Sequence, residues 1–132
     1  MNIHCGVDTV EIDRVRQSIE HYGDSFVRKV FTEEEIRYCE SRKNGRYESY
    51  AARFAAKEAV SKALGTGLAR GVTLQGIEMV NDSEGKPMVH LYGTTLQHYQ
   101  QIGGTSMDIS LTHTRSYATA FAVILTKDGE AP

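Results

Sequence analysis

The chain has 132 residues, of which 15 are Lys or Arg and 17 are Asp or Glu, so its formal net charge is -2. The length fits a single domain spanning residues 1–132. The balanced charge excludes a generally basic protein that coats nucleic acid. The longest apolar run, residues 120–125, is too short to span a membrane, and no secretory signal is visible. Because Cys5 and Cys39 lack the spacing of a disulfide framework or a metal site, we expect a cytoplasmic protein with two reduced thiols.

Hydrophobic periodicity predicts mainly helices in the first half of the chain. Residues 3–12 are rich in β-branched side chains and indicate a strand that leads into an amphipathic helix. Thr32 is followed by three glutamates, a pattern typical of a capping box, which predicts a helix to about Arg42. A long Ala-rich helix is expected over residues 46–64, where Gly65 ends it.

The second half of the chain favours strands. We expect strands at residues 76–81, 88–92, 107–113 and 117–126, and a short helix at residues 94–102. Only a few residues separate the last two strands, so they are expected to form a buried hairpin. Helices followed by hairpins predict an α+β fold, in which an antiparallel sheet packs on the long central helix.

Glu58 is the first candidate for a functional side chain. At about 100° per residue, Tyr47, Ala51, Phe54 and Glu58 share one narrow sector of the long helix, which we expect to be its buried face. A carboxylate removed from water without a partner costs several kcal/mol, so Glu58 is expected to be paired, protonated or bound to a metal. The alternative is an exposed salt bridge from Glu58 to Lys62, worth about 0.3–0.5 kcal/mol.

Asp8 raises the same question on a predicted strand, where it lies between Val7 and Val10. One interpretation is that Asp8 caps the segment that begins near Thr9. The other is that Asp8 and Glu58 share a hard cation. Mg²⁺ suits such a site, because it takes one or two protein carboxylates and completes its coordination with waters and substrate phosphates. The five histidines lack the spacing of a zinc site.

Basic residues are concentrated near the same helix. Residues 42–62 contain six Lys or Arg and two Glu, a local net charge of +4. Arg46, Arg53 and Lys57 fall on one helical row, which is either a solvated face or a surface for phosphate groups. His113 ends an apolar strand at a predicted hairpin tip, where the simplest interpretation is a half-exposed turn histidine.

Two segments together resemble the signature motifs of a known family. Residues 6–12 (Gly-Val-Asp-Thr-Val-Glu-Ile) and residues 53–67 (beginning Arg-Phe-Ala-Ala-Lys-Glu-Ala) resemble those of the holo-[acyl-carrier-protein] synthases. These are the short, single-domain type of 4′-phosphopantetheinyl transferase. Further segments match the family in order and spacing: residues 31–35, 85–87 and 110–114. In the last segment Thr112 stands where a second serine often precedes the histidine, so Thr112 must supply that hydroxyl.

The resemblance implies a magnesium-dependent enzyme that transfers 4′-phosphopantetheine from coenzyme A to a serine of apo-acyl carrier protein and releases adenosine 3′,5′-bisphosphate. It implies that Asp8 and Glu58 hold Mg²⁺ and that Lys62 neutralises phosphate charge. Glu58, acting directly or through a water molecule on the metal, is then the best candidate for the general base. The residues expected around coenzyme A are Arg46, Arg53, Ser61, Lys62, Gly65, His113 and Thr114.

The resemblance also implies a partner surface. Acyl carrier proteins are acidic, and Arg14 and Arg28 lie in a stretch with a net charge of +2, residues 14–29, so both are expected to dock the carrier protein. The alternative is that they are ordinary exposed arginines. Family members are commonly trimers with active sites between subunits, so we expect a homotrimer that binds neither nucleic acid nor membrane. Residues 127–132 are expected to be a frayed tail.

Two other functions are weighed against transfer. One is a non-catalytic module that binds coenzyme A or another nucleotide through the same basic helix. The other is a metal-dependent pyrophosphatase that gives the phosphopantetheine group to water. Both alternatives would use the same residues as the transferase. They are therefore distinguished by what the protein produces, if anything, and not by its motifs.

Overall fold

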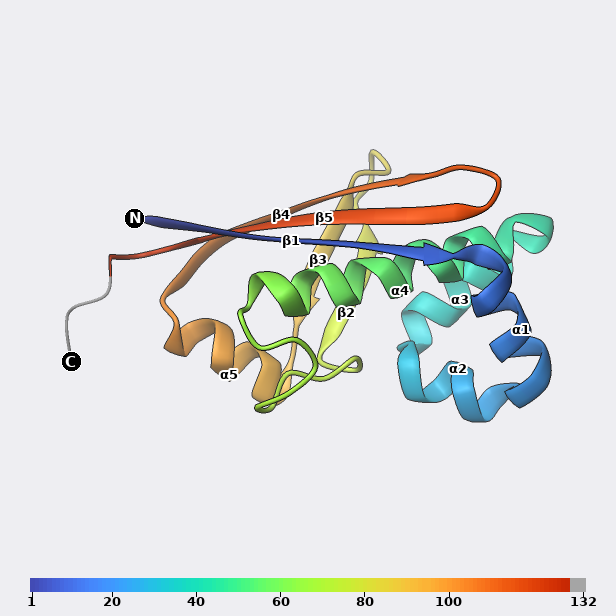
Figure 1. Ribbon diagram of the computed structural model, residues 1–132, viewed down its shortest axis with the longest axis horizontal. Coiled ribbons are helices and arrows are strands. Elements are labelled where there is room, and N and C mark those ends of the chain that lie inside the picture. Colours follow the sequence, from blue (N-terminus) through green and yellow to red (C-terminus); the bar gives the residue numbers. More distant parts are fainter. Residues whose placement is uncertain (129–132) are drawn as a thin grey trace.

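The computed structural model describes residues 1–128. In chain order the elements are β1 (Asn2–Glu11), α1 (Ile12–Tyr22), α2 (Asp24–Val30), α3 (Glu33–Ser41), the 3-10 turn η1 (Lys43–Gly45), α4 (Arg46–Ala63), β2 (Ile77–Asn81), β3 (Pro87–Leu91), α5 (Gly93–Gln101), β4 (Gly104–His113) and β5 (Tyr117–Thr126). Figure 1 shows β1, β4 and β5 lying over the long helix α4, with α1, α2 and α3 gathered near one end of α4 and α5 near the other. The predicted α+β fold, an antiparallel sheet on a long central helix, is confirmed.

Strands β1, β5 and β4 form one antiparallel sheet in that spatial order. Side chains alternate between the two faces of a strand, so every second residue of β5 faces α4. These residues are all buried: Ala118, Ala120, Ala122, Ile124 and Thr126. Their small size lets α4 lie close to the strands. The predicted hairpin of the last two strands is confirmed, and β4 begins three residues earlier than expected, at Gly104.

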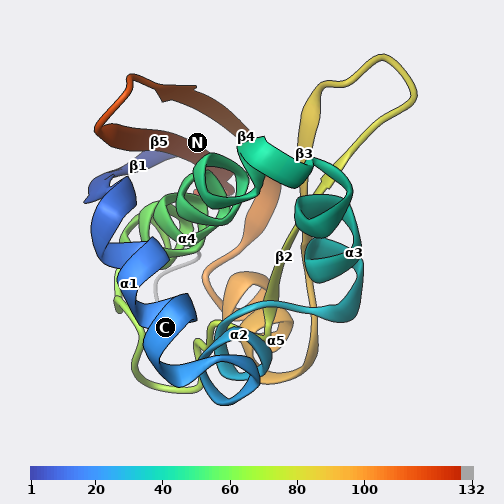
Figure 2. The ribbon, with the colours of Figure 1, turned by 90° about the vertical axis from the view of Figure 1, so that its right-hand side faces the viewer.

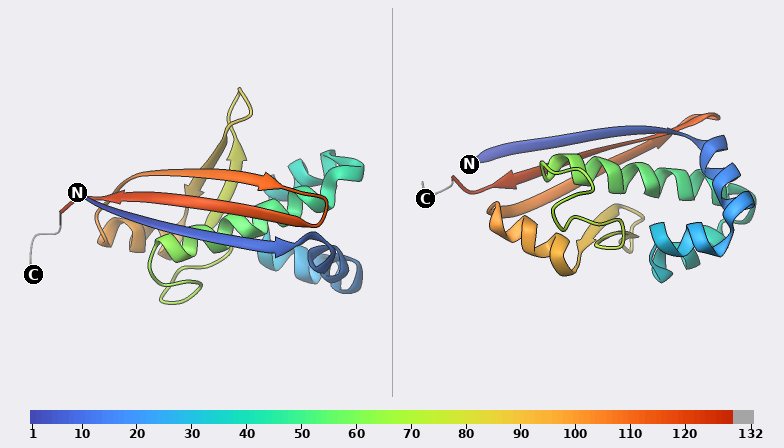
Figure 3. Two further views of the ribbon diagram at one scale, coloured as in Figure 1. Left: turned by 45° about the horizontal axis from the view of Figure 1, so that its top comes forward. Right: turned by 60° about the horizontal axis from the view of Figure 1, so that its bottom comes forward.

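The opposite face of this sheet is open in the part of the chain that is described. Figure 3 shows the three strands side by side over α4, with no helix of residues 1–128 on their other side. Large apolar side chains are exposed there: Ile3 (72%), Val7 (51%) and Phe121 (44%). A contiguous exposed apolar surface of this kind is typical of an interaction site.

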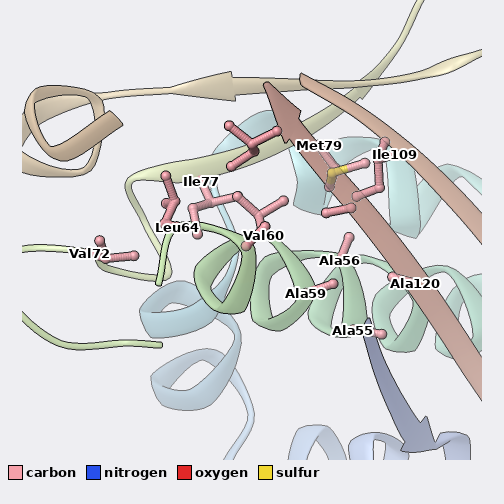
Figure 4. Close-up of a cluster of buried hydrophobic side chains, with 13 residues drawn as sticks. Ala55, Ala56, Ala59, Val60, Leu64, Val72, Ile77, Met79, Ile109 and Ala120 are labelled. Carbon is pink, nitrogen blue, oxygen red and sulfur yellow. The ribbon is translucent and has the colours of Figure 1, made fainter. Parts of the chain in front are cut away.

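Helix α4 is buried on nearly all sides, and much of its packing surface is alanine. The buried alanines are Ala51, Ala52, Ala55, Ala56, Ala59 and Ala63. Figure 4 shows Ala55, Ala56 and Ala59 in a core that also contains side chains of β2 and of the sheet. The prediction that the sector of Tyr47, Ala51, Phe54 and Glu58 is the buried face of the helix is wrong for three of its members: Ala51 is fully buried, but the other three side chains are only half-buried. The sheet and β2 cover other sides of the helix instead.

The row of basic residues on α4 is not a solvated face. Arg46 is half-buried, Arg53 is only 5% exposed, and Lys57 is completely buried. Lys57 forms an ion pair with Glu35 of α3, with Nζ 2.7 Å from Oε1, and both side chains are fully inaccessible to solvent. Burial lowers the pKa of the Lys57 ammonium, and the carboxylate of Glu35 opposes that shift.

Strands β2 and β3 form a separate two-stranded antiparallel ribbon, which projects from the body of the molecule in Figure 2. Ile77 and Met79 of β2 are buried in the core with α4. At the tip of the ribbon, the carboxylate of Asp82 accepts hydrogen bonds from the backbone N–H groups of Glu84 and Lys86. Both predicted strands and the short helix that follows them, α5, are confirmed, and each of their ends lies within one residue of the predicted position.

Helices α1, α2 and α3 pack around the N-terminal half of α4. The rings of Phe31, which follows α2, and Tyr50 of α4 lie 4.8 Å apart at the centre of this second core. The predicted capping box is confirmed: Thr32 Oγ1 accepts from the N–H of Glu35, and the Glu35 carboxylate accepts from the N–H of Thr32. Helix α2 was not predicted, because seven residues after Gly23 are too few to display a periodic pattern.

The first residues of the predicted frayed tail are tied to the fold. The N–H of Lys127 donates to the carbonyl of Gly103 at 2.9 Å, and the Asp128 carboxylate contacts the N-terminal amine of Met1. The rest of that prediction, residues 129–132, lies outside the described residues. Within residues 1–128, none of the helices has the length and apolar character needed to cross a membrane.

Candidate active site

Asp8 lies in the middle of β1, opposite Ala120 of β5, and is mostly covered. Lys62 near the C-terminal end of α4 donates two hydrogen bonds to β1. Its Nζ lies 3.0 Å from Asp8 Oδ1 and 2.9 Å from the carbonyl oxygen of Val7. The interpretation that Asp8 caps a turn is wrong, because the strand runs on to Glu11 before helix α1 begins.

Glu58 lies one helical turn before Lys62 and is half-buried. Burial raises the pKa of the Glu58 carboxyl, the negative charge of Asp8 raises it further, and the ammonium of Lys62 lowers it. Two carboxylates and one ammonium therefore meet where β1 crosses α4. The ion pairs found within residues 1–128 do not include Glu58 with Lys62, since Lys62 is paired with Asp8. The structure thus brings together Asp8, Glu58 and Lys62, which the sequence separates by up to 54 residues.

Ser61 and Gly65 flank this cluster. Ser61 is completely buried, and its hydroxyl donates to the carbonyl of Glu58 at 2.7 Å, within the helix. Gly65 is exposed and follows the end of α4 with a φ of 86°, a left-handed conformation that favours glycine. Its N–H bonds the Lys62 carbonyl at 3.0 Å. Contact of either residue with coenzyme A stays a prediction.

A cavity of about 270 Å³ lies between α3, the first half of α4 and the end of β4. The guanidinium of Arg53 lies over the ring of Tyr38, 4.0 Å from the ring centroid. Two buried polar atoms around this cavity have no hydrogen-bond partner within residues 1–128, Arg53 Nε and Glu48 Oε2. The cavity is lined by Tyr38, Arg42, Gly45, Glu48, Ser49, Ala52, Arg53, Leu111, Thr112 and His113.

Of the seven residues expected around coenzyme A, the cavity is lined by two, Arg53 and His113. Ser61, Lys62 and Gly65 lie at the cluster described above, and Arg46 and Thr114 lie at neither place. Arg46 lies against the ring of Tyr47, 4.6 Å from its centroid, and donates to the Tyr47 hydroxyl at 3.1 Å. The hydroxyl of Thr114 accepts from two N–H groups of the turn between β4 and β5, at 3.1 and 3.3 Å. Both residues therefore have local structural contacts, and their predicted role at coenzyme A is untested.

A second groove, of about 330 Å³, runs between β1, α1 and α4. Arg14 of α1 borders it, and Phe26 and Phe54 supply apolar walls. Arg28 lies apart from this groove, exposed on α2, with its guanidinium 3.8 Å from the carboxylate of Glu33. The two arginines expected to dock a partner are therefore both exposed, and only Arg14 borders an apolar groove.

Comparison with known proteins decides the family. The model of the 4′-phosphopantetheinyl transferase superfamily matches residues 4–122. The chain belongs to this superfamily. The holo-[acyl-carrier-protein] synthase of Ruminiclostridium cellulolyticum is 52% identical over 94% of this chain and 92% of its own length. The synthase of Chlamydia trachomatis is 48% identical over 89% of this chain and 95% of its own length.

Solved structures agree with this result. The holo-[acyl-carrier-protein] synthase of Neisseria meningitidis matches with a TM-score of 0.85 and 27% identity, covering 93% of this chain and 98% of that one. The synthase of Helicobacter pylori, solved in complex with coenzyme A, matches with a TM-score of 0.81 and 25% identity over 92% of this chain and 99% of that one. The chain is an enzyme of the phosphopantetheinyl transferase type.

In this transferase, the cluster at β1 and α4 offers two carboxylates as ligands for a cation. Within residues 1–128, His, Cys, Asp and Glu nowhere gather in a group of three or more that would hold a metal by protein ligands alone. Asp8 and Glu58 are hard oxygen donors, and burial together with the negative charge of Asp8 raises the pKa of Glu58. Such a pair suits a cation whose other ligands come from substrate and water.

Sequence reasoning missed part of the cavity and the ion pair beneath the site. Tyr38 on α3 and Glu48 on α4 were not singled out, because neither residue belongs to a motif or a distinctive spacing. Arg42 was counted in the basic stretch without a role. The pairing of Lys57 with Glu35 depends on packing between two helices, and the only signal in the sequence was a lysine within an Ala-rich helix.

Proposed function

We propose that this enzyme transfers 4′-phosphopantetheine from coenzyme A to a serine of apo-acyl carrier protein in the presence of Mg²⁺, and that it releases adenosine 3′,5′-bisphosphate. The observation that carries the proposal is the meeting of Asp8, Glu58 and Lys62 where β1 crosses α4. Relatives up to 52% identical are named holo-[acyl-carrier-protein] synthases, and a structural neighbour was solved with coenzyme A bound.

The residues present fit Mg²⁺. Asp8 and Glu58 both present carboxylate oxygens, and their negative charges act on the same space, which favours a cation between them. When bound, Mg²⁺ supplies charge neutralisation to the pyrophosphate and polarises its phosphorus for attack. Lys62 adds a second positive charge at the same place.

The chemistry exchanges one P–O bond for another. The serine hydroxyl oxygen of the carrier protein forms a bond to the phosphorus that bears pantetheine, and the P–O bond to the adenosine bisphosphate breaks. The serine proton passes to a base, for which Glu58, directly or through a water molecule, is our candidate, because its carboxylate lies beside Asp8 and Lys62 at the proposed site. Lys62 stabilises the charge that develops on the phosphate oxygens of the leaving group.

The cavity around Arg53 and His113 is proposed to take the 3′-phosphoadenosine end of coenzyme A. Its volume of about 270 Å³ admits part of a nucleotide. The unpartnered Nε of Arg53 gives a buried N–H that a phosphate oxygen would satisfy. Thr112, in the position where relatives often carry a serine, contributes a hydroxyl to the same cavity.

The carrier protein is proposed to dock beside α1. Arg14 borders a groove with apolar walls from Phe26 and Phe54, so an acidic helix with apolar side chains would find both charge and surface there. Arg28 lies on the neighbouring helix α2, apart from the groove, and is proposed as a second contact for the carrier protein. In this arrangement the charges set orientation and association rate more than affinity.

The proposal includes a homotrimer with active sites between subunits. Its support is the open face of the sheet β1-β5-β4, where Ile3, Val7 and Phe121 are exposed. Burial of such a face against copies of itself removes apolar area from water. Asp8 lies on the opposite face of the same sheet, and strand β4 ends at His113. An interface on the open face of the sheet would therefore lie next to the proposed active site.

A cytoplasmic location is also part of the proposal. Cys5 is exposed and Cys39 is buried, and both are free thiols. Burial raises the pKa of the Cys39 thiol to about 12, so this residue has little thiolate and is chemically inert. Free thiols persist in reducing compartments.

The deciding experiment incubates the enzyme with coenzyme A, Mg²⁺ and apo-acyl carrier protein, and follows the carrier protein by intact mass. We expect a gain of about 340 Da, the mass of the transferred group, together with release of adenosine 3′,5′-bisphosphate and loss of both on chelation of Mg²⁺. Bisphosphate without a mass gain would identify a pyrophosphatase. Binding of coenzyme A without either product, unchanged in Glu58→Gln, would identify a non-catalytic module.

A further inference from the structure

The buried ion pair of Lys57 and Glu35 lies directly behind the active site. Lys57 precedes Glu58 on α4 and points about 100° away from it around the helix axis. Its Nζ reaches the Glu35 carboxylate at 2.7 Å and also donates to the backbone carbonyls of Leu74, at 2.8 Å, and Ile77. One fully buried ammonium thus connects α4 to α3, to the loop before β2 and to β2 itself.

Glu35 completes the connection from the other side. Its Oε2 accepts from the N–H of Met79 at 2.7 Å, and its Oε1 accepts from the N–H of Thr32 at 2.8 Å. The Ile77 carbonyl and the Met79 N–H lie on the edge of β2 that faces away from β3, because alternate residues of a strand point their backbone groups to the same edge. Lys57 and Glu35 therefore bond to this edge of β2 as a neighbouring strand would. The Lys57 ammonium donates to the Ile77 carbonyl, and the Glu35 carboxylate accepts from the Met79 N–H.

Near Glu58, few other side chains of α4 reach across to another element. Apart from Lys57, the buried side chains of this half of α4 are all small: Ala55, Ala56, Ala59, Val60, Ser61 and Ala63. From Phe54 to Ala63, the side chains that hydrogen-bond to other elements within residues 1–128 are those of Lys57 and Lys62.

Lys62 belongs to the active site, so its bond to Asp8 competes with any ligand of that carboxylate. The anchor that stays in place when the site is filled is Lys57. Buried ion pairs are weak contributors to stability, and their best attested use is to specify register.

We propose that Lys57 and Glu35 are positioning residues of the active site: their ion pair, joined to the edge of β2, sets the rotation of α4 and thereby holds Glu58 opposite Asp8. This inference rests on the proposed function, since it assigns the ion pair a purpose only if Glu58 and Asp8 act together. A displacement of about 1 Å at a reacting group is enough to lower a rate by about a hundredfold.

The test uses a neutral replacement that avoids an unpaired buried charge. The double variant Lys57→Met/Glu35→Gln keeps two side chains of similar volume and leaves an amide oxygen for the N–H of Met79. Circular dichroism and a cooperative thermal transition show whether it folds. The matched control is Tyr50→Phe, on the same helix and also buried. Its hydroxyl donates to Glu40 of α3 at 2.7 Å, and within residues 1–128 it makes no hydrogen bond to β2.

In the folded double variant we expect kcat for transfer to fall by about tenfold to a hundredfold, with KM for coenzyme A and for carrier protein changed less than kcat. Binding of Mn²⁺ in the presence of coenzyme A, followed by the electron paramagnetic resonance of free Mn²⁺, should weaken in parallel. Tyr50→Phe should leave kcat and Mn²⁺ binding unchanged.

Two results separate this inference from the proposed function. A folded double variant with the kcat and Mn²⁺ affinity of the unmodified enzyme would overturn the positioning role, even if its thermal midpoint is lower. Absence of transfer by the unmodified enzyme would instead overturn the proposed function. If Lys57→Met alone fails to fold while the double variant folds and loses kcat, the uncompensated charge explains the single variant and the positioning role stands.

Discussion

Gly6 of β1 packs directly against Ala59 of α4: a Cβ atom on Gly6 would lie 2.0 Å from the carbonyl oxygen of Ala59 and 2.9 Å from Cβ of Lys62. Asp8 follows two residues later on the same face of the strand. Because Gly6 has no side chain, the backbone of β1 lies directly against α4. This close approach sets how near the Asp8 carboxylate comes to Glu58 and Lys62. Glycine at position 6 is part of the geometry of the site.

We expect Gly6→Ala to be strongly destabilising and to reduce transfer. The added methyl group has no room, because the atoms it meets include helix backbone, so β1 and α4 must move apart; overpacking of this kind typically costs about 1–3 kcal/mol. Urea unfolding and the rate of transfer measure the two effects. Asn2→Ala, at an exposed position of the same strand, should change neither. A Gly6→Ala enzyme of normal stability and rate would show that the contact is not needed.

Glu58→Gln should abolish transfer and, without Mg²⁺, stabilise the protein. The pKa of Glu58 is raised above its ordinary value of 4.5 by burial and by Asp8, so folding favours the protonated form. The stability that protonation provides is fully present below the ordinary pKa and is lost as the pH rises through the raised one. Gln cannot ionise, so the variant should unfold at a higher temperature than the unmodified enzyme at neutral pH.

The pH dependence supplies the internal check on Glu58→Gln. Below pH 4.5, where the unmodified Glu58 is protonated in both states, the two thermal midpoints should converge. Glu34→Gln, an exposed glutamate paired with Arg37, serves as the control and should shift neither activity nor midpoint. A Glu58→Gln variant that is less stable than the unmodified enzyme at neutral pH in chelator would contradict the electrostatic account.

Much of the fold follows from local pattern. The capping box at Thr32 and the Ala-rich helix α4 both depend on residues that are close together in the sequence. Both helices were therefore predicted with nearly correct bounds. Asp8 and Glu58 were identified because each is a charged residue among apolar neighbours in the sequence. The resemblance to the synthases then implied that they bind one metal ion together. The antiparallel sheet on the helix followed from the order of helices and hairpins.

What the sequence could not predict depends on contacts between distant elements. The buried face of α4 was assigned wrongly because an Ala-rich helix has no clear apolar stripe, and the sheet and β2 together decide which sides are covered. Lys57 looked like a solvent-exposed residue because its partner, Glu35, lies 22 positions earlier on another helix. The position of the Arg53 guanidinium at the cavity likewise depends on another helix, because it packs against the ring of Tyr38 on α3.

Arg53→Met should weaken the use of coenzyme A through its 3′-phosphate. A hydrogen bond to a charged group contributes about 1.5–3 kcal/mol, so loss of the guanidinium should raise KM for coenzyme A by about tenfold to a hundredfold. With 3′-dephospho-coenzyme A as donor, the variant and the unmodified enzyme should have similar KM values. Steady-state kinetics with both donors measures the difference. An equal loss with both donors would place the 3′-phosphate elsewhere.

Arg14→Glu should impair recognition of the carrier protein and leave coenzyme A binding alone. The reversed charge at the edge of the α1 groove repels an acidic partner, so kcat/KM for carrier protein should fall by about tenfold, mainly through association rate and more steeply at low salt. Lys86→Glu, in the turn between β2 and β3 and away from α1 and α2 (Figure 2), is the control for surface charge. Equal sensitivity of the two variants would argue that Arg14 is an ordinary surface arginine.

Phe121→Asp should separate the subunits of the proposed homotrimer. Phe121 lies on the outer face of the central strand β5, away from α4, so a carboxylate there leaves the core intact but opposes burial of the face against another copy. Analytical ultracentrifugation should show trimer for the unmodified enzyme and monomer for the variant. If the active sites lie between subunits, the folded monomer should also lose transfer. Gln97→Asp, exposed on α5, should stay trimeric and active. A monomeric unmodified enzyme with full activity would overturn the trimer and leave the chemistry at Asp8, Glu58 and Lys62 to a single chain.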